Sequence, residues 1–137
     1  RLMEDGSEYG IQVVQENVNK HRSADPKFLA KMKLQLGDAL KFTFDVKQSM
    51  RAGFSVDDFL EAIGKDIVHI HISDQGDRGD CLLPGDGTFD FSHLFQRMNA
   101  FKFSGDYIFE VYRECYKKHE DVIKKYNKYI KMWYNDI

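Results

Sequence analysis

The stretch Ile67-Val68-His69-Ile70-His71-Ile72-Ser73-Asp74 decides how the rest of the chain is interpreted. Its alternation predicts a strand that carries aliphatic side chains on one face and His69, His71 and Ser73 on the other. Polar side chains on a strand this apolar are costly to bury unless they have partners. We therefore expect the polar face of this strand to contribute to a site.

On both sides of this strand, apolar runs with a period of two alternate with helical patterns. Strands are predicted at 11–18, 40–46 and 107–112, and loops at 19–25, 47–54 and 74–88. Helices are predicted to begin at Asp25-Pro26, Ser55 and Asp90 and to end at Gly37, Gly64 and near Gly105. Their buried stripes are predicted to be Phe28, Leu29, Met32 and Leu36; Phe59, Leu60 and Ile63; and Leu94, Phe95 and Met98. A last helix carries Val122, Ile123, Tyr126, Ile130 and Trp133 at helical spacing. Strands that alternate with helices predict a parallel α/β sheet with helical crossovers.

The segment 74–88 is long and rich in glycine and aspartate, which is typical of a functional or a disordered loop. Its Gly85-Asp86-Gly87 turn could lie over a substrate, although turn geometry alone also explains these residues.

The composition indicates one ordinary soluble domain over residues 1–137. The chain is 42% hydrophobic and has a formal net charge of −2. This charge balance provides no positive electrostatic potential that would attract nucleic acid or an anionic membrane. No apolar run is long enough for a membrane span. Cys81 and Cys115 are not closely spaced, so we expect free thiols in a reducing compartment and a cytoplasmic location.

The polar face of each predicted strand ends in an acid or a histidine, namely Glu16, Asp45, His71 and Glu110. All four lie toward the C-terminal end of their strand, and we expect them at one level of the sheet. In a closed parallel barrel this face points inward, and the C-terminal strand ends form the mouth of the active site. Three carboxylates and an imidazole at one place need positive charge, so we predict a divalent cation: Mn²⁺, Co²⁺, Mg²⁺ or Zn²⁺.

Each of the four residues also has an ordinary structural explanation. Glu16 could cap a helix or form an ion pair, and His71 could be a hydrogen-bonded core histidine. Asp45 could cap a turn, and Glu110 could pair with Arg113 or Lys47. It is their coincidence on four strands that favours a shared metal site.

Five segments in order carry a resemblance to a known family: Gln15–Val18, Phe42–Gln48 with Arg51–Gly53, His69–Asp74, Pro84–Asp90 and Phe109–Arg113. Together they resemble the xylose-isomerase-like superfamily of (β/α)₈ TIM barrels, which includes sugar phosphate isomerases and epimerases. The resemblance implies that this chain forms strands five to eight, the C-terminal half of such a barrel. It also implies that Glu16, Asp45, His71 and Glu110 hold one divalent metal.

The resemblance implies a metal-dependent isomerase or epimerase acting on an open-chain sugar or sugar phosphate through an enediolate. Glu16 and Glu110 would then be both metal ligands and the acid/base pair. Gln48 stands where the family often has histidine, and it could bind a substrate hydroxyl. His69 is expected behind His71, and Lys47, Arg113 and Arg78 could meet a substrate anion, although solvated surface charge explains them equally well.

Two other functions stay open. Apurinic/apyrimidinic endonucleases of the same superfamily use three zinc ions, but they need a histidine at the Gln48 position and another where this chain has Asp80-Cys81-Leu82. The second alternative is a non-catalytic half-barrel, because four strands cannot close a barrel. The first residues, Arg1-Leu2-Met3-Glu4, look like the tail of a helix. We therefore expect a missing N-terminal half rather than a pair of identical copies.

Overall fold

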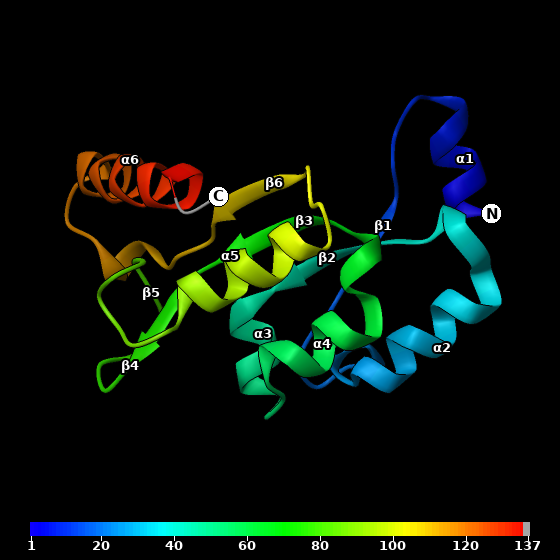
Figure 1. Cartoon of the computed structure of the whole chain (residues 1–137), viewed down its shortest axis with the longest axis horizontal. Helices are drawn as coiled ribbons and strands as arrows, with labels where there is room; N and C mark the ends of the chain where they lie inside the picture. The colour runs from blue at the N-terminus through cyan, green and yellow to red at the C-terminus, as the bar shows by residue number, and fades with distance from the viewer. Residues whose placement is uncertain (136–137) are drawn as a thin grey trace.

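The computed structural model describes the backbone of residues 1–135 and the side chains of residues 1–129. Its main sheet has four parallel strands in the order β1-β2-β3-β6 (Figure 1). The strands are β1 (Val14–Glu16), β2 (Lys41–Asp45), β3 (Ile67–Ile72) and β6 (Asp106–Phe109). The predicted parallel α/β architecture is confirmed.

Within residues 1–135, six helices connect and flank these strands, and 3₁₀ turns cover Arg22–Ala24, Gly37–Ala39, Gly64–Asp66 and Arg113–Cys115. The helices are α1 (Leu2–Glu8), α2 (Pro26–Leu36), α3 (Val46–Arg51), α4 (Val56–Ile63), α5 (Phe91–Ala100) and α6 (His119–Asn135). The predicted starts hold because polar side chains accept from free backbone N–H groups of the first turn. Asp25 caps α2, Ser55 forms a capping box with Asp58, and Asp90 caps α5.

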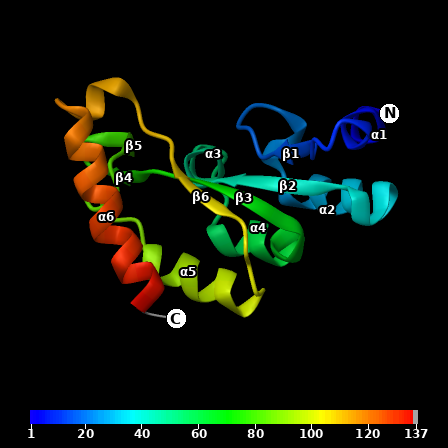
Figure 2. The same ribbon diagram turned by 90° about the horizontal axis from the view of Figure 1, so that it is seen from above.

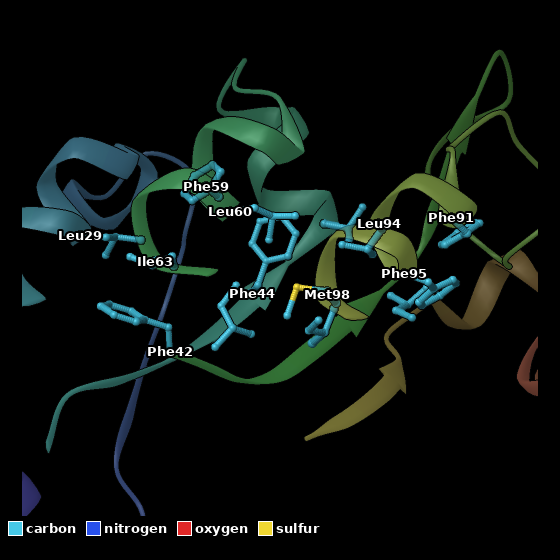
Figure 3. Close-up of a cluster of buried hydrophobic side chains, with 14 of the residues drawn as sticks. Leu29, Phe42, Phe44, Phe59, Leu60, Ile63, Phe91, Leu94, Phe95 and Met98 are labelled. Carbon is cyan, nitrogen blue, oxygen red and sulfur yellow. The ribbon is translucent and has the colours of Figure 1, made fainter. Parts of the chain in front are cut away.

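One face of the sheet carries the hydrophobic core, and α2, α4 and α5 cover that face (Figure 2). Figure 3 shows Phe42 and Phe44 of β2 among side chains from these helices. The fully or nearly fully buried helix residues include Leu29, Phe59, Leu60, Ile63, Leu94 and Met98. The alternation that buries Phe42 and Phe44 sends Thr43 and Asp45 to the opposite face. Because side chains alternate along each strand, burial of one set in the core places the other set on the face of the candidate site.

Several predicted boundaries and burials are wrong. The first strand is limited to three residues because its pairing with β2 runs only from Val14 to Glu16, and Ile11 is exposed. The strand predicted at 107–112 ends at Phe109. Leu36, at the C-terminal end of α2, is half-exposed rather than buried.

The predicted loop at 47–54 is largely helix α3, because the side chain of Asp45 caps it by accepting from the backbone N–H of Gln48 (2.9 Å). The predicted loop at 74–88 contains an antiparallel hairpin of β4 (Asp74–Gly76) and β5 (Gly79–Leu82). Loops are predicted at both places for the same reason. These elements are stabilised by hydrogen bonds, and their sequences lack the periodic apolar residues from which helices and strands are predicted.

The rest of the 74–88 segment is held by the buried carboxylate of Asp74. It accepts from the backbone N–H groups of Gln75, Gly85, Gly87 and Phe89, at distances between 2.8 and 3.0 Å. A Cβ on Gly87 would lie 2.0 Å from the carbonyl oxygen of Gln75, so only glycine fits there. The turn is thus explained by its own hydrogen bonds.

The two edge strands, β1 and β6, are flanked by α1 and α6, which lie at opposite ends of the molecule (Figures 1 and 2). Most of the large exposed apolar side chains among the described residues belong to these end regions: Leu2, Tyr9 and Ile11 near β1, and Ile108, Tyr112, Ile123 and Tyr126 near β6. In the last helix, Tyr126 packs on Phe109 with ring centroids 5.5 Å apart. The predicted positions Ile130 and Trp133 lie outside the described side chains. Among the described helices, none is long and apolar enough to cross a membrane.

Candidate metal centre

The four predicted ligands come together at the C-terminal edge of the main sheet. Glu16 ends β1, Asp45 ends β2, His71 lies near the end of β3, and Glu110 directly follows β6. The backbone N–H of Glu110 donates to the carbonyl of Ile72 (3.0 Å), which keeps this residue in line with β3. One potential ligand atom from each of the four residues lies within 4.8 Å of the others.

The four residues do not all occupy matching register positions on neighbouring strands, although the sequence pattern predicted that they lie at one level of the sheet. Asp45 pairs with His71, but Glu16 pairs with Thr43, two residues earlier on β2. Glu110 lies two residues beyond Ile108, the register partner of His71. This progressive stagger is typical of barrel-forming sheets, whose tilted strands bring successive register positions to one height. The strand register, which residue patterns do not reveal, explains why the four side chains meet despite the stagger.

His71 occupies the middle of the cluster. Its Nδ1 atom lies 2.7 Å from Glu110 Oε2, 3.3 Å from Glu16 Oε1 and 3.6 Å from Asp45 Oδ2. The carboxylates of Asp45 and Glu16 raise the pKa of His71 to about 10. Burial raises the pKa of Asp45, but His71 and the Gln48 N–H lower it, and the net shift is downward. The cluster therefore favours bound positive charge.

Three buried atoms of this cluster have no hydrogen-bond partner among the described residues: Asp45 Oδ2, His71 Nδ1 and Glu110 Oε2. His71 Nδ1 and Glu110 Oε2 are close, but their orientation forms no hydrogen bond. Buried polar atoms without partners are unfavourable and require an explanation. Opposite ligands of a cation with bonds of about 2.0–2.3 Å lie roughly 4–4.6 Å apart, close to the observed spread. The donor set and its geometry fit a divalent cation.

Asp45 is held by Asn17, which sequence reasoning did not single out. The Asn17 side chain donates to the Asp45 carbonyl (2.9 Å) and accepts from the Asp45 N–H (2.7 Å). Asn17 is 1% exposed, so neither bond competes with water. Because Asp45 Oδ1 caps α3, only Oδ2 faces the cluster. The sequence signal that could have identified Asn17 is its position directly after Glu16, the acid that ends a predicted strand.

Lys47 is the least expected member of the cluster. Its side chain is 3% exposed, and its Nζ donates to Glu110 Oε1 (2.9 Å) and lies 3.5 Å from Asp45 Oδ2. Burial lowers the pKa of Lys47, but Glu110 and Asp45 raise it more, so the ammonium stays charged. A solvated surface charge is therefore the wrong interpretation of Lys47. Of the two partners considered for Glu110, the structure selects Lys47.

The other predicted substrate contacts occupy different surroundings. Gln48 accepts from the backbone N–H of Asn19 (3.0 Å). The ring of His69 stands edge-on to the ring of His71, with centroids 5.0 Å apart. The pKa of His69 is lowered, mainly by burial and to a smaller extent by the neighbouring His71. Arg113 donates to the carbonyls of Tyr116 and Lys117, and Arg78 donates to the carbonyl of Asp86. Substrate contact by any of them stays a prediction.

The β4–β5 hairpin borders the cluster through contacts that the sequence pattern did not reveal. Arg51 of α3 pairs with Asp80 and donates to the hydroxyl of Tyr112 (3.0 Å). Cys81 Sγ donates to the Glu110 carbonyl (3.3 Å), and Cys115 Sγ donates to the Cys81 carbonyl (3.2 Å). Both thiols are free, as predicted, and burial raises the pKa of Cys81.

Comparison with known proteins gives a consistent result. The model of a family described as "xylose isomerase-like TIM barrel" matches residues 1–133. No match is found among curated proteins.

Three solved structures share the fold. A D-tagatose 3-epimerase-like protein is 22% identical, with a TM-score of 0.71, and the match covers 98% of this chain and 51% of that one. The apo form of 3-keto-D-glucoside 4-epimerase from E. coli is 19% identical, with a TM-score of 0.73 and coverages of 98% and 49%. A protein from Sinorhizobium meliloti 1021 is 16% identical, with a TM-score of 0.71 and coverages of 93% and 53%. The chain thus spans about half the length of each solved structure.

Proposed function

We propose that this chain, which belongs to the xylose isomerase-like TIM barrel family, forms the metal-binding half of a sugar isomerase or epimerase. The observation that carries the proposal is the convergence of Glu16, Asp45, His71 and Glu110 at one strand edge. Two of the structures that share its fold are described as an epimerase and an epimerase-like protein. The substrate would be a sugar or sugar phosphate.

The four clustered residues would hold the cation, and Glu16 and Glu110 would also transfer the proton. When bound, a divalent cation would polarise a substrate carbonyl and stabilise the negative charge that develops on its oxygen. Glu16 and Glu110 enter the cluster from the two outer strands, so their carboxylates approach from opposite sides. One would remove a proton from the carbon beside the carbonyl, and the other would return a proton. The face or atom that receives it would decide between epimerisation and isomerisation.

The complete pocket requires a second half-barrel in this proposal. Four strands leave two open edges, and the solved structures that match are about twice as long as this chain. An N-terminal half of the same architecture would cover the polar face and complete the substrate pocket. A second copy of this chain is the other possible complement.

Metal titration and hydrogen exchange test the proposal directly. Calorimetric titration of the chain with Mn²⁺, Co²⁺, Mg²⁺ and Zn²⁺ should show one site per chain. Sugars and sugar phosphates incubated in D₂O with the completed barrel should exchange the hydrogen beside the carbonyl, which reports proton removal whichever product forms. Absence of a metal site would leave a non-catalytic half-barrel as the better explanation.

Glu110→Gln is the informative variant for the proton-transfer role. We expect at least a 10²-fold loss of deuterium incorporation, roughly the contribution of one general acid or base, with the melting temperature retained. Glu114→Gln, four residues away and exposed, is the matched control and should exchange hydrogen like the parent. Undiminished exchange by Glu110→Gln would show that Glu110 is not part of the acid/base pair.

A further inference from the structure

Lys47 is buried among the carboxylates that are proposed to bind the metal. It lies in the first turn of α3, two residues after Asp45, and its side chain is 3% exposed. Lysine is rarely buried to this degree, because its ammonium loses hydration and must recover that energy from charged partners. Glu110 at 2.9 Å and Asp45 at 3.5 Å provide those partners. The burial therefore links Lys47 to the cluster rather than to solvent.

The surroundings keep the ammonium in this place. Lys47 Nζ lies 5.5 Å from the centroid of the Tyr112 ring, a distance at which the ring face attracts a cation. The Tyr112 hydroxyl accepts from Arg51, and Arg51 pairs with Asp80 of the β4–β5 hairpin. Tyr112 thus faces the ammonium with its ring, and its hydroxyl is held by Arg51. Lys47 is poorly placed to receive a substrate anion.

Lys47 also determines which oxygen of Glu110 faces the cluster. Glu110 Oε1 accepts from Lys47, and Oε2 lies beside His71. The two carboxylate oxygens of Asp45 also have different surroundings: Oδ1 accepts from the Gln48 N–H, and Oδ2 points into the cluster. Each of these carboxylates therefore presents one oxygen to a cation and has the other fixed by a protein donor.

The charges give Lys47 a second role. Glu16, Asp45 and Glu110 contribute three negative charges, and Lys47 contributes one positive charge. With His71 neutral as a ligand, the formal total is −2, which a divalent cation would neutralise. We propose that Lys47 is a built-in counter-cation of the metal centre: it holds the carboxylates together before metal binds and fixes Glu110 as a one-oxygen ligand. This inference rests on the proposed metal function.

Replacement of Lys47 by methionine, which keeps most of the side-chain length but removes the charge, tests the role. In EDTA, we expect Lys47→Met to melt several degrees below the parent, because Asp45 and Glu110 lose the buried positive charge that lies beside them. In saturating Mn²⁺, most of this loss should disappear. Calorimetry should show Mn²⁺ binding about tenfold tighter in Lys47→Met, because a positive charge near the cation has been removed.

Lys41→Met is the matched control. Lys41 lies on the same strand as Asp45 and pairs with Asp66 at 2.7 Å, away from the cluster, so its replacement should lower the melting temperature equally with and without Mn²⁺. Lys47→Arg keeps the charge, and its Mn²⁺ affinity should stay within about threefold of the parent. If Lys47→Met folds only with Mn²⁺ present, the inference is supported.

Two results would overturn the inference while leaving the metal site intact. One is an equal loss of melting temperature for Lys47→Met in EDTA and in Mn²⁺. The other is an arginine variant that tightens Mn²⁺ binding as much as the methionine variant does. If Lys47→Met folds in neither condition, a purely structural role replaces the inference. Failure of the parent chain to bind any divalent ion would instead remove the proposed function, and this inference with it.

Discussion

Asp45 divides its two carboxylate oxygens between the backbone and the candidate site. Oδ1 caps α3, and Oδ2 faces His71 without a hydrogen bond. The backbone of Asp45 is held on both sides by the side chain of Asn17, which replaces the sheet hydrogen bonds lost where β1 ends. The position of one ligand atom thus depends on an amide that does not itself belong to the cluster.

Asn17→Ala should therefore destabilise the protein and weaken metal binding. Its removal leaves a buried N–H and a buried carbonyl without partners, and we expect a loss of about 2–4 kcal/mol in the free energy of unfolding. Urea denaturation measures this loss, and Mn²⁺ titration measures the weaker binding. Asn19→Ala is the control: Asn19 takes part through its backbone N–H, and its replacement should cost less than about 0.5 kcal/mol. Equal losses in both variants would contradict the role given to Asn17.

At the scale of elements, the segment after β3 is organised around one buried carboxylate. Asp74 accepts from four backbone N–H groups distributed between Gln75 and Phe89. It thereby joins the start of the β4–β5 hairpin to the turn that precedes α5. The hairpin in turn contacts Arg51 and Glu110 through Asp80 and Cys81, so the shape of this segment affects the rim of the cluster.

Asp74→Ala should lower the free energy of unfolding by about 2–4 kcal/mol, because several buried donors lose their acceptor. Hydrogen exchange should accelerate most at the amides of Gly85, Gly87 and Phe89. Asp77→Ala changes an exposed residue of the same hairpin and should leave this exchange pattern unaltered. Unchanged protection in Asp74→Ala would show that other contacts hold the segment.

A second ion-pair group lies at the opposite end of β3. Asp66 Oδ1 lies 2.7 Å from both Lys33 of α2 and Lys41 of β2, and it connects these elements to the start of β3. Burial raises the pKa of Asp66, but Lys33 and Lys41 outweigh burial and lower it. A carboxyl whose folded-state pKa is lowered stabilises the fold above its unfolded value near 3.8, and this stability is lost as the pH falls through the folded pKa.

We therefore expect Asp66→Asn to cost roughly 1–2 kcal/mol at pH 7 and to make the stability less dependent on pH below about 4. Urea denaturation from pH 2 to 7 measures both effects. Asp38→Asn is the comparison, since Asp38 also pairs with Lys33, at 3.3 Å, but is fully exposed. A stability profile of Asp66→Asn parallel to that of the parent would contradict this account.

At the scale of the whole molecule, the sheet has two open edges and a polar face that bears the candidate site. Exposed apolar side chains occur near both edges, with Ile11 on the β1 side and Ile108 and Ile123 on the β6 side. Unpaired strand edges flanked by apolar side chains favour association with another sheet. In the solved structures that share the fold, the matched part is about half of the chain.

The isolated chain should therefore associate with a second copy at micromolar concentration. Sedimentation velocity should show a species larger than the 16.0 kDa monomer. Ile108→Asp combined with Ile123→Asp should shift it toward the monomer, whereas Leu34→Asp, at an exposed position of α2, should not. A monomer throughout the concentration range would contradict this prediction.

Residue patterns along the chain were enough to predict the parallel α/β class, the helix starts and the four residues that meet at the strand ends. These features follow from local rules: the alternation of apolar residues along β2 and β3, the caps Asp25, Ser55 and Asp90, and an acid or histidine near the end of each main strand. Each of these rules uses only the residues of one short segment, so it can be applied without knowing the fold.

Three features became visible only in the folded chain: the stagger of the proposed ligands, the burial of Lys47 and the support of Asp45 by Asn17. Each depends on the relative placement of segments that are distant in the sequence: Lys47 meets Glu110 across 63 residues, and Asn17 meets Asp45 across 28. A lysine in a helix that begins after a strand looks like surface charge until the neighbouring strand brings a carboxylate to it. Register and long-range electrostatics arise from packing, so residue patterns alone cannot specify them.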